Sequence, residues 1–166
     1  INWLPSLLVS QGYSLRHATF AALAFPLGGA IGTLMLGLLV ARGAKKAVVV
    51  GAFAGIVLSV AGLAVVPHDT TVMLCASLAA GFFVIGSQFL LYGLSPTYYP
   101  AAVRGTGVGA AVAGGRLGSI AGPVLAGTLI SAGQPAAHVL MSIVPGVFLA
   151  FLAAFTLTRI ASVAED

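Results

Sequence analysis

Long apolar segments separated by short polar connections dominate the chain. A helix that crosses a bilayer needs about 20 mostly apolar residues, because each residue advances it by about 1.5 Å. The first nine residues are apolar but reach across only about half of a bilayer. Each of the later apolar segments is long enough to cross. The expected spans are 1–9 (partial), 17–41, 47–66, 72–94, 105–132 and 137–157.

The connections between these segments carry turn residues and charges. Glycine, proline and clusters of small polar residues interrupt regular structure, so these stretches predict loops. The sequence therefore predicts an all-α membrane protein with about five and a half transmembrane helices. The expected loops are 10–15, 42–46, 67–71, 95–104 and the turn at 134–135.

Composition supports an integral membrane protein and excludes several other classes. Hydrophobic residues make up 60% of the chain and charged residues 6%, which is typical of a chain that spans a membrane. The net charge of +4 comes without a basic cluster with interleaved aromatic residues, so no nucleic-acid partner is expected. Nothing resembles a phosphate-binding loop, a nucleophile elbow or a zinc site. We therefore expect no enzyme activity, no metal and no cofactor, and the single cysteine excludes an internal disulfide.

Basic residues at the segment ends predict the orientation. Cytoplasmic loops of membrane proteins carry an excess of Lys and Arg. One side of the predicted bundle has five basic residues, and the other has only Arg16. We therefore expect a multi-pass protein of the inner (cytoplasmic) membrane with its C-terminus in the cytoplasm. The basic residues of the expected cytoplasmic side are Arg42, Lys45, Lys46, Arg104 and Arg159.

The first residues suggest that a longer protein contains this chain. It begins Ile1-Asn2-Trp3-Leu4-Pro5, without an initiator Met or the charged start of a signal peptide. The expected layout is one partial and two full spans, followed by three more. This layout fits a three-plus-three inverted repeat of the kind nested in transporter halves.

Arg116 is the strongest candidate for contact with a ligand, because it lies in the middle of an otherwise uncharged span. A charge at bilayer depth costs about 2.5–3.5 kcal/mol on insertion scales, so it needs a polar cavity or a partner. The alternative is that Arg116 bonds to carbonyl groups of a neighbouring helix and has only a structural role.

Small residues repeat every four positions in the same span and predict close helix packing there. Arg116 lies about 200° around the helix from Gly118, away from this predicted ridge. A second set of glycines follows Pro26 and predicts bending and close packing in the first full span. The predicted ridge consists of Ala110, Gly114, Gly118 and Gly122, and the second set of Gly28, Gly29 and Gly32.

Gln88 and Tyr92 are four residues apart and so share one face of the third full span. A polar stripe inside a span indicates either a cavity wall or hydrogen bonding between helices. Trp3 is a candidate for stacking on a ligand, although tryptophan commonly anchors a helix at the membrane interface. The carboxylates, Asp69, Glu165 and Asp166, all lie outside the spans. A residue that exchanges protons within the membrane is therefore not expected in this chain.

Four sequence motifs resemble one known family. They are NWLP at 2–5, PLGGAIGTLMLG at 26–37, YYPAAVRGTGVG at 98–109 and GGRLGSIAGP at 114–123. With them the whole chain resembles the C-terminal half of a major facilitator superfamily transporter, most closely the aromatic acid:proton symporter family. The resemblance implies twelve spans in the full protein, an N-terminal half outside this chain, and uptake of aromatic carboxylates with protons.

The resemblance also implies roles for individual residues. Arg116 matches an arginine of the eleventh helix and would pair with the substrate carboxylate. From their positions in the chain, we further expect Gln88, Tyr92 and Trp3 to line the aromatic part of the site. Arg42 and Arg104 are the candidate gating residues. The family usually has an acidic residue before the first of these arginines, and this chain has Ala41 there. The alternatives left open are transport of another organic anion, such as a sugar acid or dicarboxylate, and a membrane scaffold that transports nothing.

Overall fold

The computed structural model describes residues 4–10, 12–65 and 69–159, and in these ranges the chain forms only helices and turns. The all-α prediction is therefore confirmed for the described residues. Five stretches of this part are long and apolar enough to cross a membrane. The helices are α1 (Leu4–Ser10), α2 (Leu15–Ala41), α3 (Lys45–Val65), α4 (Thr70–Leu94), the short 3-10 helix η1 (Ser95–Tyr98), α5 (Arg104–Ser131), α6 (Ala136–Met141) and α7 (Val144–Leu157).

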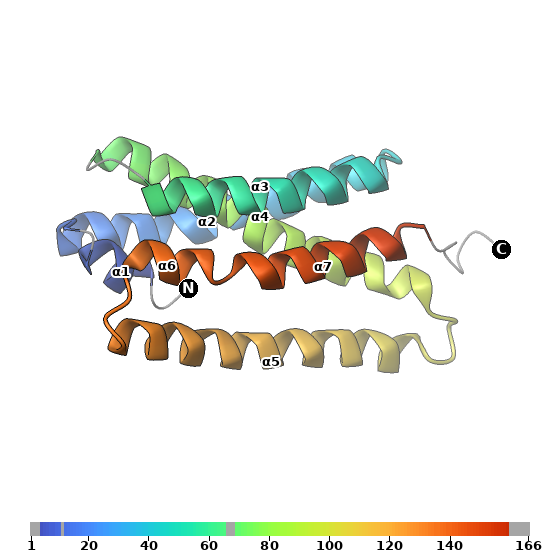
Figure 1. Ribbon diagram of the computed structural model, residues 1–166. Coiled ribbons are helices and arrows are strands. Elements are labelled where there is room, and N and C mark those ends of the chain that lie inside the picture. Colours follow the sequence, from blue (N-terminus) through green and yellow to red (C-terminus); the bar gives the residue numbers. More distant parts are fainter. Residues whose placement is uncertain (1–3, 11, 66–68, 160–166) are drawn as a thin grey trace.

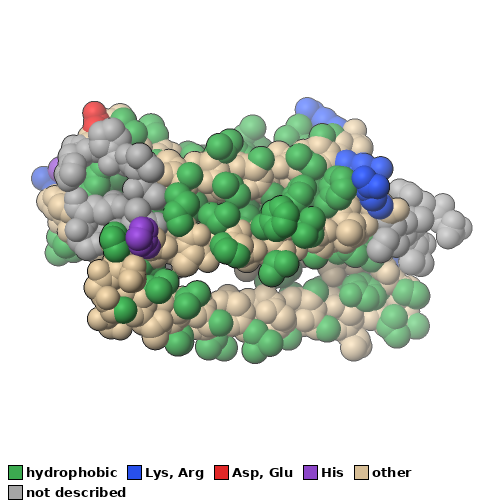
Figure 2. Space-filling view, viewed as in Figure 1, with side chains coloured by type: hydrophobic (Ala, Val, Ile, Leu, Met, Phe, Trp, Pro, Cys, Tyr) green, Lys and Arg blue, Asp and Glu red, His purple; other side chains and the backbone are tan. Residues whose placement is uncertain are grey.

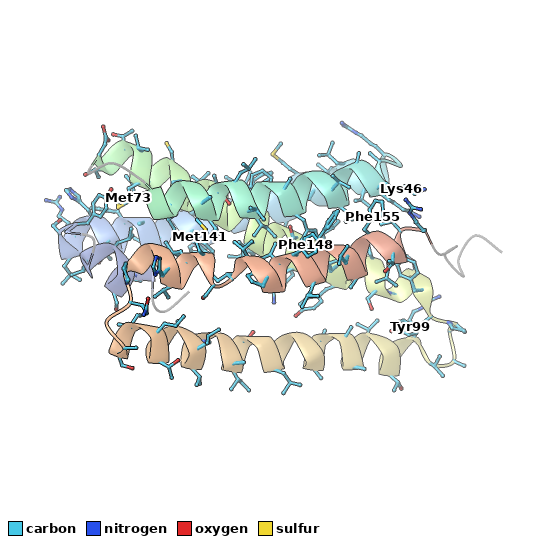
Figure 3. All side chains as sticks on the ribbon, viewed as in Figure 1. Lys46, Met73, Tyr99, Met141, Phe148 and Phe155 are labelled. Carbon is cyan, nitrogen blue, oxygen red and sulfur yellow. The ribbon has the colours of Figure 1, made fainter. Side chains whose placement is uncertain are left out.

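The long helices run side by side, and their directions alternate along the chain (Figure 1). The α2–α3 turn, the segment from η1 to α5 and the end of α7 consequently lie at one end of the bundle. Lys46 and Tyr99 mark this end in Figure 3. Blue Lys and Arg side chains gather there in Figure 2, whereas the acidic side chain in view lies at the opposite end. The described fold thus brings the basic loops together at one end.

The closest packing in the bundle joins α2 to α4. A Cβ atom on Gly28 would collide with the backbone of Leu78, and one on Gly81 would collide with the backbone of Phe25. Gly32 meets the backbone of Phe82 in the same way. Glycine has no Cβ, so these two helices approach each other backbone to backbone. The close packing predicted for the glycines of the first full span is confirmed.

The predicted glycine ridge of α5 is wrong for the described structure. A Cβ atom on Gly114, Gly118 or Gly122 would meet no atom within 4 Å. No residue of α5 is buried, and Figure 2 shows an opening between part of this helix and the rest of the bundle. The physical reason is that α5 lies apart from its neighbours along most of its length, so the residues of this ridge have no helix to approach.

The last expected span, 137–157, is broken into two helices. Proline has no N–H group, so Pro145 cannot donate the helical hydrogen bond to Met141. The chain instead makes a short turn at Ser142 and Ile143, and α7 begins at Val144. α7 then packs on α3, where the ring centroids of Phe53 and Phe151 lie 5.9 Å apart.

The glycine contact between α2 and α4 makes a stability prediction. Gly32→Ala places a methyl group in the backbone of Phe82, and overpacking of this kind costs about 1–3 kcal/mol. We expect a lower melting temperature and lower membrane abundance of the complete protein. Gly37→Ala, in the same helix with no atom within 4 Å, is the matched control and should leave both quantities unchanged. Equal behaviour of the two variants would contradict the packing assignment.

Candidate functional site

Arg116 lies near the middle of α5, about 18 Å along the helix from Arg104. Its side chain is exposed. Within the described part of the chain it makes no hydrogen bond and no ion pair. The structural alternative, in which the guanidinium bonds to carbonyl groups of a neighbouring helix, is therefore not what these residues show. The cation is left free to meet a group from outside the described bundle.

Gln88 and Tyr92 form a polar pair on α4. The side-chain Nε2 of Gln88 donates a hydrogen bond of 3.2 Å to the Tyr92 hydroxyl oxygen, so their predicted position on one face is confirmed. The ring of Phe89 stands at 88° to the Tyr92 ring, with the centroids 6.2 Å apart, which is a favoured edge-to-face arrangement. The Tyr92 hydroxyl still has its own proton to donate to another group.

The direction of this pair is set by the packing of α4 on α2. Gln88 follows Gly81 by seven residues and Tyr92 follows it by eleven, which places all three on one stripe of the helix. Gly81 lies against the backbone of α2. Farther along α4 the same stripe carries Gln88 and Tyr92, and there it faces α5.

Tyr92 reaches α5 beside Arg116. Its hydroxyl oxygen lies 2.6 Å from the position that a Cβ atom on Gly115 would occupy. Gly115 immediately precedes Arg116 in the sequence. The structure therefore brings the Gln88–Tyr92 pair to the part of α5 that carries the cation. Sequence reasoning missed Gly115 and Phe89, because Gly115 is one of several glycines in α5 and nothing in the sequence distinguishes it.

The other predicted site residues lie elsewhere. Trp3 falls outside the residues that the structure describes. Arg42 caps the C-terminus of α2, where its backbone N–H donates to the carbonyl oxygen of Leu38. Arg104 begins α5, and its Nε donates to the carbonyl oxygen of Tyr99 over 3.4 Å. Both arginines lie at the basic end, away from Arg116, and their gating role stays a prediction.

The opposite end of the bundle holds the one acidic residue of the described segments. Asp69 caps the N-terminus of α4 by accepting hydrogen bonds from the backbone N–H groups of Thr71 and Val72. Burial and the nearby Asp69 carboxylate together raise the pKa of Tyr13 above its usual value of 10.0. In the ranges described, no three His, Cys, Asp or Glu residues come together as metal ligands would.

A surface hollow lies between α3 and α4, separate from these residues. It is lined by Gly51, Ala54, Gly55, Leu58, Ser59, Ala79 and Phe83. Its lining contains none of the predicted site residues and is mostly apolar. The hollow is therefore not part of the polar and aromatic group that α4 presents to α5.

Comparison with known proteins gives a family match and several transporter relatives. A family model described as Major Facilitator Superfamily matches residues 1–165. The 3-(3-hydroxy-phenyl)propionate transporter of Escherichia coli is 41% identical over 95% of this chain and 39% of its own length. The gallate transporter of Pseudomonas putida is 32% identical over 80% of the chain and 30% of its own length. The benzoate transport protein of Acinetobacter baylyi is 34% identical over 81% of the chain and 28% of its own length.

This chain thus spans about two fifths of the length of the Escherichia coli relative. No solved structure shows a significant match. The family match covers nearly every residue, and the relatives named above are all transporters of aromatic acids. The chain belongs to the Major Facilitator Superfamily, and within it resembles the transporters of aromatic acids.

Proposed function

We propose that this chain is one half of a secondary transporter that carries an aromatic carboxylate across the cytoplasmic membrane. The main support for the proposal is the position of Arg116. This cation lies halfway along an apolar helix and has no partner among the described residues. It lies next to the point where Tyr92 reaches α5. The described residues form a helical, membrane-compatible fold, and the chain has transporter relatives.

Arg116 supplies the charge that a carboxylate requires. A guanidinium presents a planar fork of donors and can hold a carboxylate through two parallel hydrogen bonds. An isolated cation in an apolar span is costly, and a bound anion offsets that cost. Because the described chain supplies no anionic partner for Arg116, the substrate carboxylate takes that place in our proposal.

The aromatic side chains of α4 supply a surface for the ring of the substrate. Phe89 and Tyr92 are held edge to face, and a third ring can pack against such a pair in the same geometry. Gln88 and the Tyr92 hydroxyl add polar groups beside them. The relatives named above carry hydroxyphenylpropionate, gallate and benzoate by name, and each compound combines a ring with a carboxylate. A sugar acid or a dicarboxylate satisfies Arg116 equally well but has no aromatic ring to pack edge to face against this pair.

Transport would proceed by alternating access, with this bundle rocking against a second half around a site near the middle of the membrane. The chain matches 39% of the length of the Escherichia coli relative, which is consistent with one half of such a protein. The acidic residue of the described part, Asp69, caps a helix at the end of the bundle. The group that binds the co-transported proton would therefore lie in the other half.

Replacing Arg116 tests the substrate contact. In the complete transporter, Arg116→Ala should abolish uptake and binding of an aromatic carboxylate while membrane abundance stays near normal. Arg116→Lys should recover little, because the ammonium group keeps the charge but lacks the planar fork. Uptake of labelled substrate and equilibrium binding to purified protein measure the two effects.

Arg16→Ala is the control for loss of a positive charge. Arg16 lies at the Asp69 end of the bundle, away from Arg116, and its guanidinium carbon is 5.9 Å from the centroid of the Phe20 ring. Its loss should leave uptake intact. A purely structural Arg116 predicts the reverse pattern: low abundance of both Arg116 variants, with unchanged affinity in the surviving protein. Unchanged affinity of Arg116→Ala would reject the substrate contact.

The proposed orientation places the basic end of the bundle in the cytoplasm. In a Cys75→Ser background, a cysteine at position 69 should react with an impermeant thiol reagent added outside intact cells. A cysteine at position 45 should react only after the cells are opened. The two positions lie at opposite ends of α3 and α4 (Figure 1). Labelling of both from the same side would contradict the span assignment.

A further inference from the structure

We infer that Gly115 is a positioning residue whose missing side chain sets the Tyr92 hydroxyl beside Arg116. The inference rests on the proposed function, because it concerns how the aromatic wall of α4 and the cation of α5 are held together. It concerns a residue that carries no chemistry of its own.

The contact is local and specific to this glycine. The Tyr92 hydroxyl oxygen lies 2.6 Å from the place of a Gly115 Cβ atom, whereas the neighbouring Gly114 has no atom within 4 Å of that place. Elsewhere α5 approaches the bundle near its two ends, where Gly107 meets the Tyr99 ring and Leu129 and Ile130 pack on the core. Tyr92 is therefore a contact of α4 with α5 at the level of the cation.

A methyl group at Gly115 would displace the Tyr92 hydroxyl. An ordinary van der Waals contact begins at 3.4 Å, so the oxygen must move away by about 0.8 Å. Because the hydroxyl is the end of a side chain, the Tyr92 ring moves and the backbone stays in place. Movement disturbs the 3.2 Å hydrogen bond from Gln88 and the edge-to-face contact with Phe89. The polar and aromatic groups of α4 then no longer lie in their original positions relative to Arg116.

Removing the hydroxyl should remove the conflict. The next nearest atoms to the Gly115 Cβ position are the ring carbons Cζ and Cε1 of Tyr92, at 3.7 and 3.8 Å. These are ordinary contact distances. An alanine at position 115 therefore fits against a phenylalanine at position 92 without any movement of the ring. The two positions are coupled through one oxygen atom, and this predicts a specific pattern of rescue.

The test measures binding of 3-(3-hydroxyphenyl)propionate to the purified complete transporter. Gly115→Ala should weaken binding by about tenfold or more, because a displacement near 1 Å in a binding site has effects of this order. Gly114→Ala is the matched control and should bind normally. Tyr92→Phe should weaken binding by no more than about tenfold, the value of one hydrogen bond. The double variant Gly115→Ala, Tyr92→Phe should bind as well as Tyr92→Phe alone.

Three results would overturn the inference: normal binding by Gly115→Ala, a further loss in the double variant relative to Tyr92→Phe, or no measurable binding by Tyr92→Phe. Failure of the proposed function has a different signature. In that case the wild-type protein does not bind the aromatic acid, or Arg116→Ala binds it normally. If Arg116→Ala loses binding while Gly115→Ala retains it, the proposed function stands and only the role of Gly115 falls.

Discussion

Backbone contact between α2 and α4 is the constraint on which the rest of the described structure depends. Inside a bilayer, burial of apolar side chains gives helices little reason to associate, because lipid is as apolar as they are. Helices in a bilayer associate instead through close van der Waals packing at small residues. Gly28, Gly32 and Gly81 allow this packing here. The contact fixes the rotation of α4 about its own axis. Because Gly81 and Tyr92 share a stripe of that helix, the same contact determines where Tyr92 points.

α5 has the opposite character. It carries Arg116 but contributes no buried residue to the described bundle, and it meets α4 beside the cation through Tyr92 and Gly115. A helix held at few points can change its position at low cost, which suits the alternating access that we propose. In our account the closely packed α2–α4 pair supplies the aromatic wall, and the loosely packed α5 brings the charge to it.

The sequence predicted the helices well, because a bilayer imposes a minimum length and an apolar composition on each span. It did not predict the break before α7, although Pro145 is visible in the sequence, since a proline in a span can also produce only a kink. The glycine patterns of α2 and α5 look alike in the sequence. The ridge glycines Gly114, Gly118 and Gly122 have no neighbour within 4 Å, whereas Gly28 and Gly32 meet the backbone of α4. Which helices lie close together is decided by the three-dimensional arrangement.

The sequence likewise predicted the separate parts of the candidate site but not how they meet. The spacing of Gln88 and Tyr92 predicted a shared face, and their hydrogen bond confirms it. The isolated charge of Arg116 was equally visible. Their meeting at Gly115 was not, because it depends on the distance between two helices that are separated in the sequence by η1 and a loop.

The most direct test of this account compares an aromatic carboxylate with its uncharged amide. Binding of 3-(3-hydroxyphenyl)propionate and of its primary amide is measured by calorimetry on the complete transporter and on Arg116→Ala. Hydrogen bonds to a charged group are worth about 1.5–3 kcal/mol, so the wild-type protein should prefer the carboxylate by about tenfold or more. In Arg116→Ala the two ligands should bind with similar affinity. A preference for the carboxylate that survives the loss of Arg116 would contradict the account.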